Sequence, residues 1–437
     1  MFRRIKPIER REEVKFPADL RKLGYFINKQ DQIRRIEEPS EGFKYYIHKV
    51  ERVNERHREA IDECIRRVLD KRFAAEGLSK HYFPRGCDPK TDRCVPILIS
   101  DDLDDTEKVL IIVGSTFDDL GVWSVREMEG PGINHGSMIS TIQSAKEENF
   151  RFIILNCGQN VYSPEVGRAV RYTTWKAATK SSPHIDEVLN RVPGHENVQN
   201  HVRSILDEVK GRVLGKKRIY FLTYGWGCWG VVKYLNDHFS EWKSSLEALI
   251  AVEPTHTISD IVNPDLVHFL RTRSRGYIAH ADPPGTFIPD KRFISQTFST
   301  NQMHSECIIP HVWKSLMLPW FKRVEEDPEG CNPVMAVDWS AVEKLQEGWG
   351  DASLHTKADL DPNKWDFYDE DDEEEEEMSE GQKPWLRNLE QVVDLRDAEQ
   401  AASITTGLQA VNLQENIRPG SGGESKSNGV GKAAPSA

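Results

Sequence analysis

The chain has 437 residues, which is enough for one large domain with tails or for two ordinary domains. Its apolar content of 38% is low for a fully globular protein, so part of the length is expected to be disordered. The net charge is −12, but the run from Asp369 to Glu377 carries nine acidic residues, and the remainder is nearly neutral at −12 + 9 = −3. This charge excludes a basic nucleic-acid surface, so direct nucleic-acid binding is not expected.

The first residues lack the apolar core of a signal peptide, and no apolar run approaches the ~18 residues of a membrane span. We therefore expect a protein that is neither secreted nor inserted in a membrane. The cysteines are Cys64, Cys87, Cys94, Cys157, Cys228, Cys307 and Cys331. Their odd number and the lack of CxxC spacing predict reduced thiols in the cytosol or nucleus. Cys87 and Cys94 could form a disulfide or share a metal ion, but no second pair supports zinc, so no metal or cofactor is expected.

Short apolar runs and helical periodicity define the predicted elements. The predicted strands are residues 25–27, 32–36, 95–100, 109–113, 152–156, 219–222, 245–252, 277–279 and 294–298. The predicted helices are residues 53–72, 137–148, 195–209, 262–271 and 311–321, the last bent or ended near Pro319. Residues 158–195 show little periodicity and predict an insertion or lid over the edge of a sheet.

Strands that alternate with helices predict parallel β-α-β units, and so an α/β fold. The runs 109–113, 152–156, 219–222 and 249–252 are apolar without alternation, which predicts neighbouring parallel strands covered on both faces. We expect an α/β-hydrolase-like, doubly wound, mostly parallel sheet with helices on both faces. The domain is placed at residues 15–325, after a charged tail at 1–14. Residues 326–437 are predicted to be a linker and a largely disordered acidic tail, with a possible short helix at 384–402.

One stretch organises the rest of the chain. The strand at 219–222 leads into Thr223-Tyr224-Gly225-Trp226-Gly227, followed by apolar residues at helical spacing. Strand, glycine turn and helix form the layout of a nucleophile elbow, where Gly-x-Ser-x-Gly presents a serine. In this register Gly225 stands where the nucleophile belongs. The sequence therefore predicts an elbow without a reactive side chain.

The other parts of a hydrolase site follow in the required order. Glu253 directly follows the strand at 245–252, and His304 lies between the last strand and the last helix. Gly114 and Ser115 follow the strand at 109–113, where an oxyanion loop belongs. Gly225, Glu253 and His304 are thus interpreted as relic triad positions. For each of these positions the alternative is a role without catalysis. A carboxylate at a strand end often caps the adjoining backbone or lies in a solvated turn, and a lone histidine is often only a polar residue.

Three other side chains could supply a nucleophile. Cys228 lies three residues beyond Gly225, already in the helix, where a buried apolar thiol is the favoured interpretation. Ser115 and Thr223 have no placed base. Because losing the nucleophile costs acyl transfer roughly six orders of magnitude in rate, no hydrolysis is expected. The alternative hypothesis is an active esterase or amidase with a displaced serine or cysteine nucleophile.

Two features suggest partner binding. Three aromatic residues surround the predicted elbow: Tyr224, Trp226 and Trp229. Their side chains could fill the space where a substrate would bind, or they could anchor a partner, since Trp and Tyr dominate interface hot spots. The acidic run beginning at Asp369 cannot fold, because its charges repel one another. It is either solvated or in contact with a basic partner such as a histone or an RNA-binding protein.

The sequence resembles the Arb-two domain family, named for an Argonaute-binding protein of fission yeast, over about residues 15–322. The most specific match is Phe16-Pro-Ala-Asp-Leu-Arg-Lys-Leu-Gly-Tyr-Phe26, and the runs 109–115 and 152–156, the elbow, and His304 before Trp313-Lys-Ser315 follow in family order. A similar domain forms the C-terminal part of some fungal class II histone deacetylases, but this chain has no deacetylase half.

The resemblance implies a hydrolase-like fold used mainly for binding, with an Argonaute-type protein and associated silencing subunits as partners. It also implies a role in small-RNA-directed silencing and heterochromatin, in the nucleus or cytoplasm. This chain departs from the family pattern at Gly225, where some members have the elbow serine, and at Val113, where a histidine often precedes the Gly-Ser pair. Both departures argue against catalysis.

Overall fold

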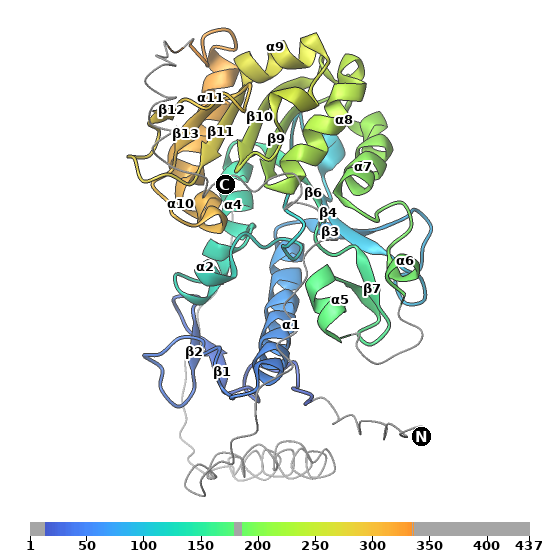
Figure 1. Ribbon diagram of the computed structural model, residues 1–437, viewed down its shortest axis with the longest axis vertical. Helices are drawn as coiled ribbons and strands as arrows, with labels where there is room; N and C mark the ends of the chain where they lie inside the picture. The colour runs from blue at the N-terminus through green and yellow to red at the C-terminus, as the bar shows by residue number, and fades with distance from the viewer. Residues whose placement is uncertain (1–13, 179–185, 334, 336–437) are drawn as a thin grey trace, which may run out of the picture. The chain divides into compact units, whose positions relative to one another are not determined.

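The computed structural model describes residues 14–178, 186–333 and 335 (Figure 1). Its main sheet has nine strands in the order β12-β13-β11-β10-β9-β5-β6-β4-β3. These strands are β3 Leu78–Phe83, β4 Val95–Ser100, β5 Lys108–Val113, β6 Phe150–Leu155, β9 Arg218–Tyr224, β10 Leu246–Val252, β11 Ser274–Ile278, β12 Phe287–Ile288 and β13 Gln296–Ser299. From β6 through β5, β9, β10 and β11 to β13, every neighbouring pair is parallel. The prediction that four apolar runs form neighbouring parallel strands is confirmed.

Alternate residues of the central strands serve two separate cores. In β5, Leu110 and Ile112 pack with one core, while Val109, Ile111 and Val113 pack with the other. The first core contains α1 Glu51–Ala75, α4 Ile139–Glu147, α10 Ile308–Val312 and α11 Leu318–Glu326. The second contains α7 Val198–Val213, α8 Trp226–Trp242 and α9 Pro264–Arg273, and Figure 1 shows α7 beside α8. Helices on both faces explain why these strands show no polar alternation.

The structure adds elements that the sequence pattern did not predict. β3 is an antiparallel edge strand beside β4, and its side chains are mostly half-buried. The stretch predicted as an insertion contains a hairpin of β7 Val161–Ser163 and β8 Arg168–Val170, followed by α5 Tyr172–Ala178 and α6 Glu187–Asn190. Earlier in the chain, the two strands predicted at residues 25–27 and 32–36 are present as β1 Tyr25–Ile27 and β2 Ile33–Arg35, and they pair with each other. α2 Val125–Glu129 and α3 Ile133–Gly136 follow β5, and single helical turns lie at Leu103–Asp105, Ile258–Asp260 and Ser305–Cys307.

The cysteines and the C-terminal helix differ in part from the expectations. Cys87 and Cys94 form a disulfide, which was one of the alternatives left open for this pair, and are therefore not reduced thiols; the other five cysteines are free and buried. The C-terminal helix is interrupted before Pro319, because a π-helical turn, Trp313–Met317, separates α10 from α11. Pro319 itself lies in the first turn of α11, where a missing N–H costs little.

Parts of the predicted organisation lie outside the described residues: the tail at 1–13, the acidic run from Asp369 to Glu377 and the possible helix at 384–402. The last described helix, α11, ends at Glu326. The domain boundaries at 15 and 325 stay predictions. Among the described residues, no helix combines the length and apolar character needed to cross a membrane.

The contact between α8 and the end of β5 predicts a sharp difference between two glycines. A Cβ on Gly227 would lie 2.4 Å from the Gly114 carbonyl oxygen and 2.6 Å from that of Val113, and backbone atoms cannot give way. Gly227→Ala is therefore expected to cost at least about 2 kcal/mol of unfolding free energy. Gly211→Ala in α7 is the matched control, since its Cβ meets nothing within 4 Å, and it should stabilise by about 0.5–1 kcal/mol. Urea unfolding of both variants measures the difference, and equal effects would contradict this packing.

Candidate functional site

The structure has the elbow that the glycine spacing predicts. β9 ends at Tyr224, Gly225 adopts φ 53° and ψ −126°, and α8 begins at Trp226. Gly225 donates its N–H to the Val252 carbonyl at 2.9 Å. Its own carbonyl accepts from the Cys228 N–H and from Thr255 Oγ1, each at 2.9 Å. Backbone hydrogen bonds therefore hold the elbow, and no side chain at Gly225 is needed.

The predicted oxyanion loop lies directly against the elbow. A Cβ on Gly225 would lie 3.0 Å from Ser115 Oγ and 3.3 Å from Ser115 Cβ. Ser115 is 8% exposed, so little solvent reaches its hydroxyl. Burial raises the pKa of the nearby Asp118 to about 7, although a backbone hydrogen bond from Ser115 opposes the shift. Asp118 Oδ2 has no hydrogen-bond partner within the described part of the chain.

The two other relic triad positions are not joined to each other by a hydrogen bond or ion pair within the described residues. Glu253 follows β10 with φ 48°, and its carboxylate accepts from the Ala279 N–H. Burial raises the pKa of Glu253. His304 is exposed and precedes the turn Ser305–Cys307, and the Tyr224 hydroxyl lies 3.3 Å from Ser305 Oγ.

Cys228 lies behind the elbow in a buried pair with His256, a residue that the sequence analysis did not single out. Cys228 Sγ is 3.3 Å from His256 Nδ1, and both residues are fully buried. Burial raises the pKa of the Cys228 thiol to about 12 and lowers that of His256 to about 4. At neutral pH the pair is an uncharged thiol beside an uncharged imidazole, not a thiolate–imidazolium nucleophile. Thr223 is also occupied, because its hydroxyl donates to the Ile250 carbonyl at 2.9 Å.

The aromatic residues around the elbow are half-buried. Trp226 and Trp229 lie edge to face with ring centroids 6.1 Å apart, and Trp229 packs against the second core. Tyr224 packs against the first core, and burial raises its pKa. Tyr224 and Trp229 therefore contribute to core packing, Trp226 contacts the Trp229 ring, and all three side chains are partly exposed.

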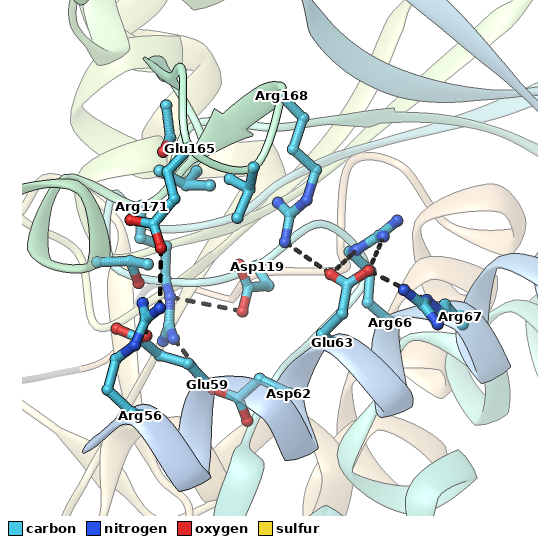
Figure 2. A pocket seen from close by; sticks show the side chains of 14 residues that line it. Arg56, Glu59, Asp62, Glu63, Arg66, Arg67, Asp119, Glu165, Arg168 and Arg171 are labelled. Carbon is cyan, nitrogen blue, oxygen red and sulfur yellow. Dashed lines mark hydrogen bonds and ion pairs between the residues drawn. The ribbon is translucent and has the colours of Figure 1, made fainter. Parts of the chain in front are cut away.

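A cavity of about 310 Å³ lies between α1 and the β7–β8 hairpin (Figure 2). Five arginines and five carboxylates line it: Arg56, Arg66, Arg67, Arg168, Arg171, Glu59, Asp62, Glu63, Asp119 and Glu165. Figure 2 shows the α1 side chains facing those of the hairpin, and the two groups are joined by ion pairs. Sequence patterns could not find this network, because its partners lie about 105 residues apart, as for Glu63 and Arg168.

The ion pairs place the hairpin on α1 and on the loop after β5. Arg171 contacts Asp62 at 3.1 Å and Asp119 at 3.4 Å. Arg168 contacts Glu63 at 2.9 Å. Because the charges are balanced and paired, the cavity is a polar junction between α1 and the hairpin rather than a one-sign ligand site.

A third group of residues has donor atoms suited to a metal ion. Glu127, His135 and His311 bring one carboxylate oxygen and two imidazole nitrogens within 4.8 Å of one another. No metal site was expected from the sequence, where only the cysteine spacing was weighed. Glu127, His135 and His311 lie on three separate helices and show no ligand spacing. The Cys228–His256 pair is likewise joined only by the fold, whereas Asp118 lies three residues from Ser115 in the sequence.

These observations define a class: a protein of α/β-hydrolase-like fold whose elbow presents a glycine where the nucleophile belongs. A profile of the Arb2 domain matches residues 16–284, and the chain therefore belongs to the Arb2 domain family.

The curated relatives are distant. A "Cotranscriptional regulator ARB2A homolog" of Dictyostelium discoideum is 22% identical over 251 residues, which cover 55% of this chain and 62% of the relative. "Cotranscriptional regulator ARB2A" of Mus musculus is 19% identical over 334 residues, covering 68% of this chain and 80% of the relative. A homolog of Xenopus tropicalis is 26% identical over 154 residues, covering 35% of this chain and 36% of the relative. The chain thus spans less than two thirds of the length of two of these three relatives.

Among solved structures, "A histone deacetylase from Saccharomyces cerevisiae" is similar with a TM-score of 0.39 and 14% identity. The similarity covers 60% of this chain and 96% of the deacetylase chain.

The elbow geometry predicts a cost for restoring a side chain. Gly225→Ser and Gly225→Ala place a Cβ at positive φ and against Ser115, so each should lose about 1–3 kcal/mol of unfolding free energy. Ser115→Gly removes the contact, and the double variant Gly225→Ala with Ser115→Gly should lose less than the sum of the single losses. Denaturant unfolding of Gly225→Ala, Ser115→Gly and the double variant gives the three values that are compared. Strict additivity would show that the two positions do not touch.

The charged cavity predicts an acid-dependent loss of stability. Burial opposes the shift, but Arg66 and Arg168 lower the pKa of Glu63 from 4.5 to about 2. A folded-state pKa below the unfolded one stabilises the protein above about pH 4.5, and this stabilisation is lost as the pH falls toward 2. Glu63→Gln should therefore cost on the order of 1 kcal/mol at pH 7, after allowance for solvent screening, and flatten the stability profile between those values.

Glu165→Gln is the control for that profile, because Glu165 is more exposed than Glu63 and its ion pair within the described part of the chain is with Arg56. It should leave the profile nearly unchanged. If the unfolding free energies of Glu63→Gln and of the unmodified chain fell in parallel as the pH was lowered, the lowered pKa of Glu63 would be contradicted.

Proposed function

We propose that this chain is a non-catalytic adaptor of hydrolase-like fold that acts in cotranscriptional gene regulation. The observation that carries the proposal is Gly225 itself, which occupies the apex of a well-formed elbow and has no side chain to attack a substrate. The names of the curated relatives, cotranscriptional regulators, support the regulatory part. A nuclear location belongs to the same proposal.

The side chains near the elbow support the non-catalytic part. Cys228 is buried as a neutral thiol, and Ser115 has no histidine base among its described contacts. Glu253 is engaged by the Ala279 backbone, while His304 faces solvent. A serine or cysteine mechanism needs an accessible nucleophile in contact with its base. Cys228 does contact His256, but both residues are fully buried and uncharged, and Ser115, Glu253 and His304 make no such contact with one another among the described residues.

The resemblance to the Arb-two family extends the proposal to its partners. An Argonaute-type protein and its silencing subunits would bind this chain, which would then act in small-RNA-directed silencing and heterochromatin assembly. The partly exposed faces of Trp226 and Trp229, beside the elbow, would form part of the contact. The acidic run from Asp369 to Glu377 would contact a basic partner.

The second candidate is an esterase or amidase with a displaced nucleophile. One observation favours it: Asp118, with a pKa near 7, lies close enough to Ser115 to accept a hydrogen bond from its backbone. A carboxyl group of that pKa suits a general base at neutral pH. Ser115 Oγ would then be the attacking atom.

Chemical labelling separates the two candidates. With a fluorophosphonate probe, and an active serine hydrolase as the positive control, the unmodified chain should show no labelling above a heat-denatured sample. Ser115→Ala and Cys228→Ala should make no difference. Labelling that disappears in Ser115→Ala would make this protein an enzyme and end the adaptor proposal.

Co-precipitation tests the partner. The full chain, expressed in cells that contain an Argonaute protein, should recover that protein, and Trp226→Ala should recover less. His304→Ala should recover the same amount, because His304 is not part of the proposed contact. Circular dichroism confirms that both variants are folded. Failure of the unmodified chain to recover Argonaute would remove the Argonaute part of the proposal, whatever the labelling result.

A further inference from the structure

We propose that Glu127, His135 and His311 bind a divalent transition-metal ion of the Zn²⁺ class. This site is separate from the charged cavity and does not depend on the proposed function. It uses one residue from each of three helices that follow β5 or β13.

The donor atoms already converge. His135 Nε2 lies 3.2 Å from Glu127 Oε2, and His311 Nε2 lies 3.1 Å from the same oxygen. Around a tetrahedral zinc ion with bonds of about 2.0–2.1 Å, neighbouring ligand atoms are separated by roughly 3.3 Å. Binding a metal ion would therefore require only small side-chain movements. Two imidazoles and one carboxylate are also the protein ligands of many open zinc sites.

The carboxylate is buried and poorly satisfied without an ion. Glu127 is 8% exposed, and its ion pairs within the described residues are to the two histidines. Glu127 Oε2 and His135 Nε2 are buried atoms without a well-formed hydrogen bond in the described part of the chain. A buried carboxylate oxygen without a well-formed hydrogen bond costs free energy, and a cation placed between these atoms would satisfy it.

The backbone fixes two of the ligands relative to each other. Ser124 caps α2 by accepting from the Glu127 N–H, and the Ser124 N–H itself donates to the Gly136 carbonyl. A Cβ on Gly136 would lie 2.3 Å from the Met128 nitrogen, so α2 and α3 are in backbone contact. His135, one residue before Gly136, is thereby held beside Glu127. Such preorganisation favours metal binding, because little ordering remains to be done.

His311 closes the site from the C-terminal part of the domain. Ile308, Ile309 and Val312 of α10 are buried in the first core, whereas His311 is exposed on the opposite side. Figure 1 shows α10 close to α2, as the His311–Glu127 contact requires. The side chains of His135 and His311 are 34% and 39% exposed, so an ion can enter from solvent and a water can complete its coordination.

Zinc titration of the metal-stripped full chain tests the proposal. Isothermal titration at pH 7.5 should show one zinc ion bound per chain with micromolar or tighter affinity. His311→Gln and Glu127→Gln should each weaken that binding at least tenfold. Cobalt(II) in place of zinc should give visible absorption bands that are lost in the same variants, because imidazole and carboxylate ligands generate them.

Controls separate this site from other cation binding. The acidic run from Asp369 to Glu377 can attract divalent ions in every variant, so the result is the difference between variants and the unmodified chain. His238→Gln is the matched control, because His238 Nδ1 also lies 3.1 Å from a glutamate, Glu241, but no second histidine joins that pair among the described contacts. It should bind zinc as the unmodified chain does.

Melting temperatures guard against a folding artefact. His311 is partly exposed, so metal-free His311→Gln should melt near the unmodified chain, while zinc should raise the melting temperature of the unmodified chain but not that of His311→Gln. Equal zinc affinity and equal thermal shifts in the unmodified chain and in His311→Gln would overturn the proposal. So would the absence of zinc binding up to millimolar concentration.

Discussion

The close backbone contact between the start of α8 and the end of β5 is the constraint on which the site depends. Gly227 leaves no room for a Cβ beside the carbonyls of Val113 and Gly114. To bring α8 this near, the chain must turn sharply after Tyr224, and Gly225 makes that turn at φ 53° and ψ −126°. The same contact sets Gly114 and Ser115 over the elbow. The central strands, the turn and the loop above it are therefore one packed unit.

This unit does not need the chemistry that such an elbow usually supports. Gly225 donates a hydrogen bond to the Val252 carbonyl and accepts from the Cys228 N–H and the Thr255 hydroxyl, and none of these bonds involves a side chain at the apex. Glycine also tolerates positive φ at little cost, whereas a serine there must be held by its surroundings. A hydrolase-like fold can therefore exist without an apex side chain, and its stability gives no reason to expect activity. The function of such a fold has to be argued from its surfaces and side-chain clusters.

The sequence predicted those parts of the fold whose signal is local. Runs such as residues 109–113 are apolar throughout because both sheet faces are covered, and the glycine spacing after β9 marks the elbow directly. β3 was missed because Leu78-Ser-Lys-His-Tyr-Phe83 is an edge strand whose exposed and half-buried positions carry polar residues. The pair of Cys228 with His256, and the cluster around Glu127, were missed because tertiary structure alone joins them. Residue type and spacing carry no information about such contacts.

The ionic junction between α1 and the hairpin is better understood as a means of fixing geometry than as a source of stability. Charges that are largely removed from water lose hydration, and their mutual attraction often does little more than offset that loss. Asp62 contacts both Arg58 of its own helix and Arg171 of the hairpin, so the position of its carboxylate depends on both segments. A shifted hairpin would leave several charges unpaired, and that penalty selects one register. Since Arg171 also contacts Asp119 on the loop after β5, the junction positions the loop that continues toward Ser115 and the elbow.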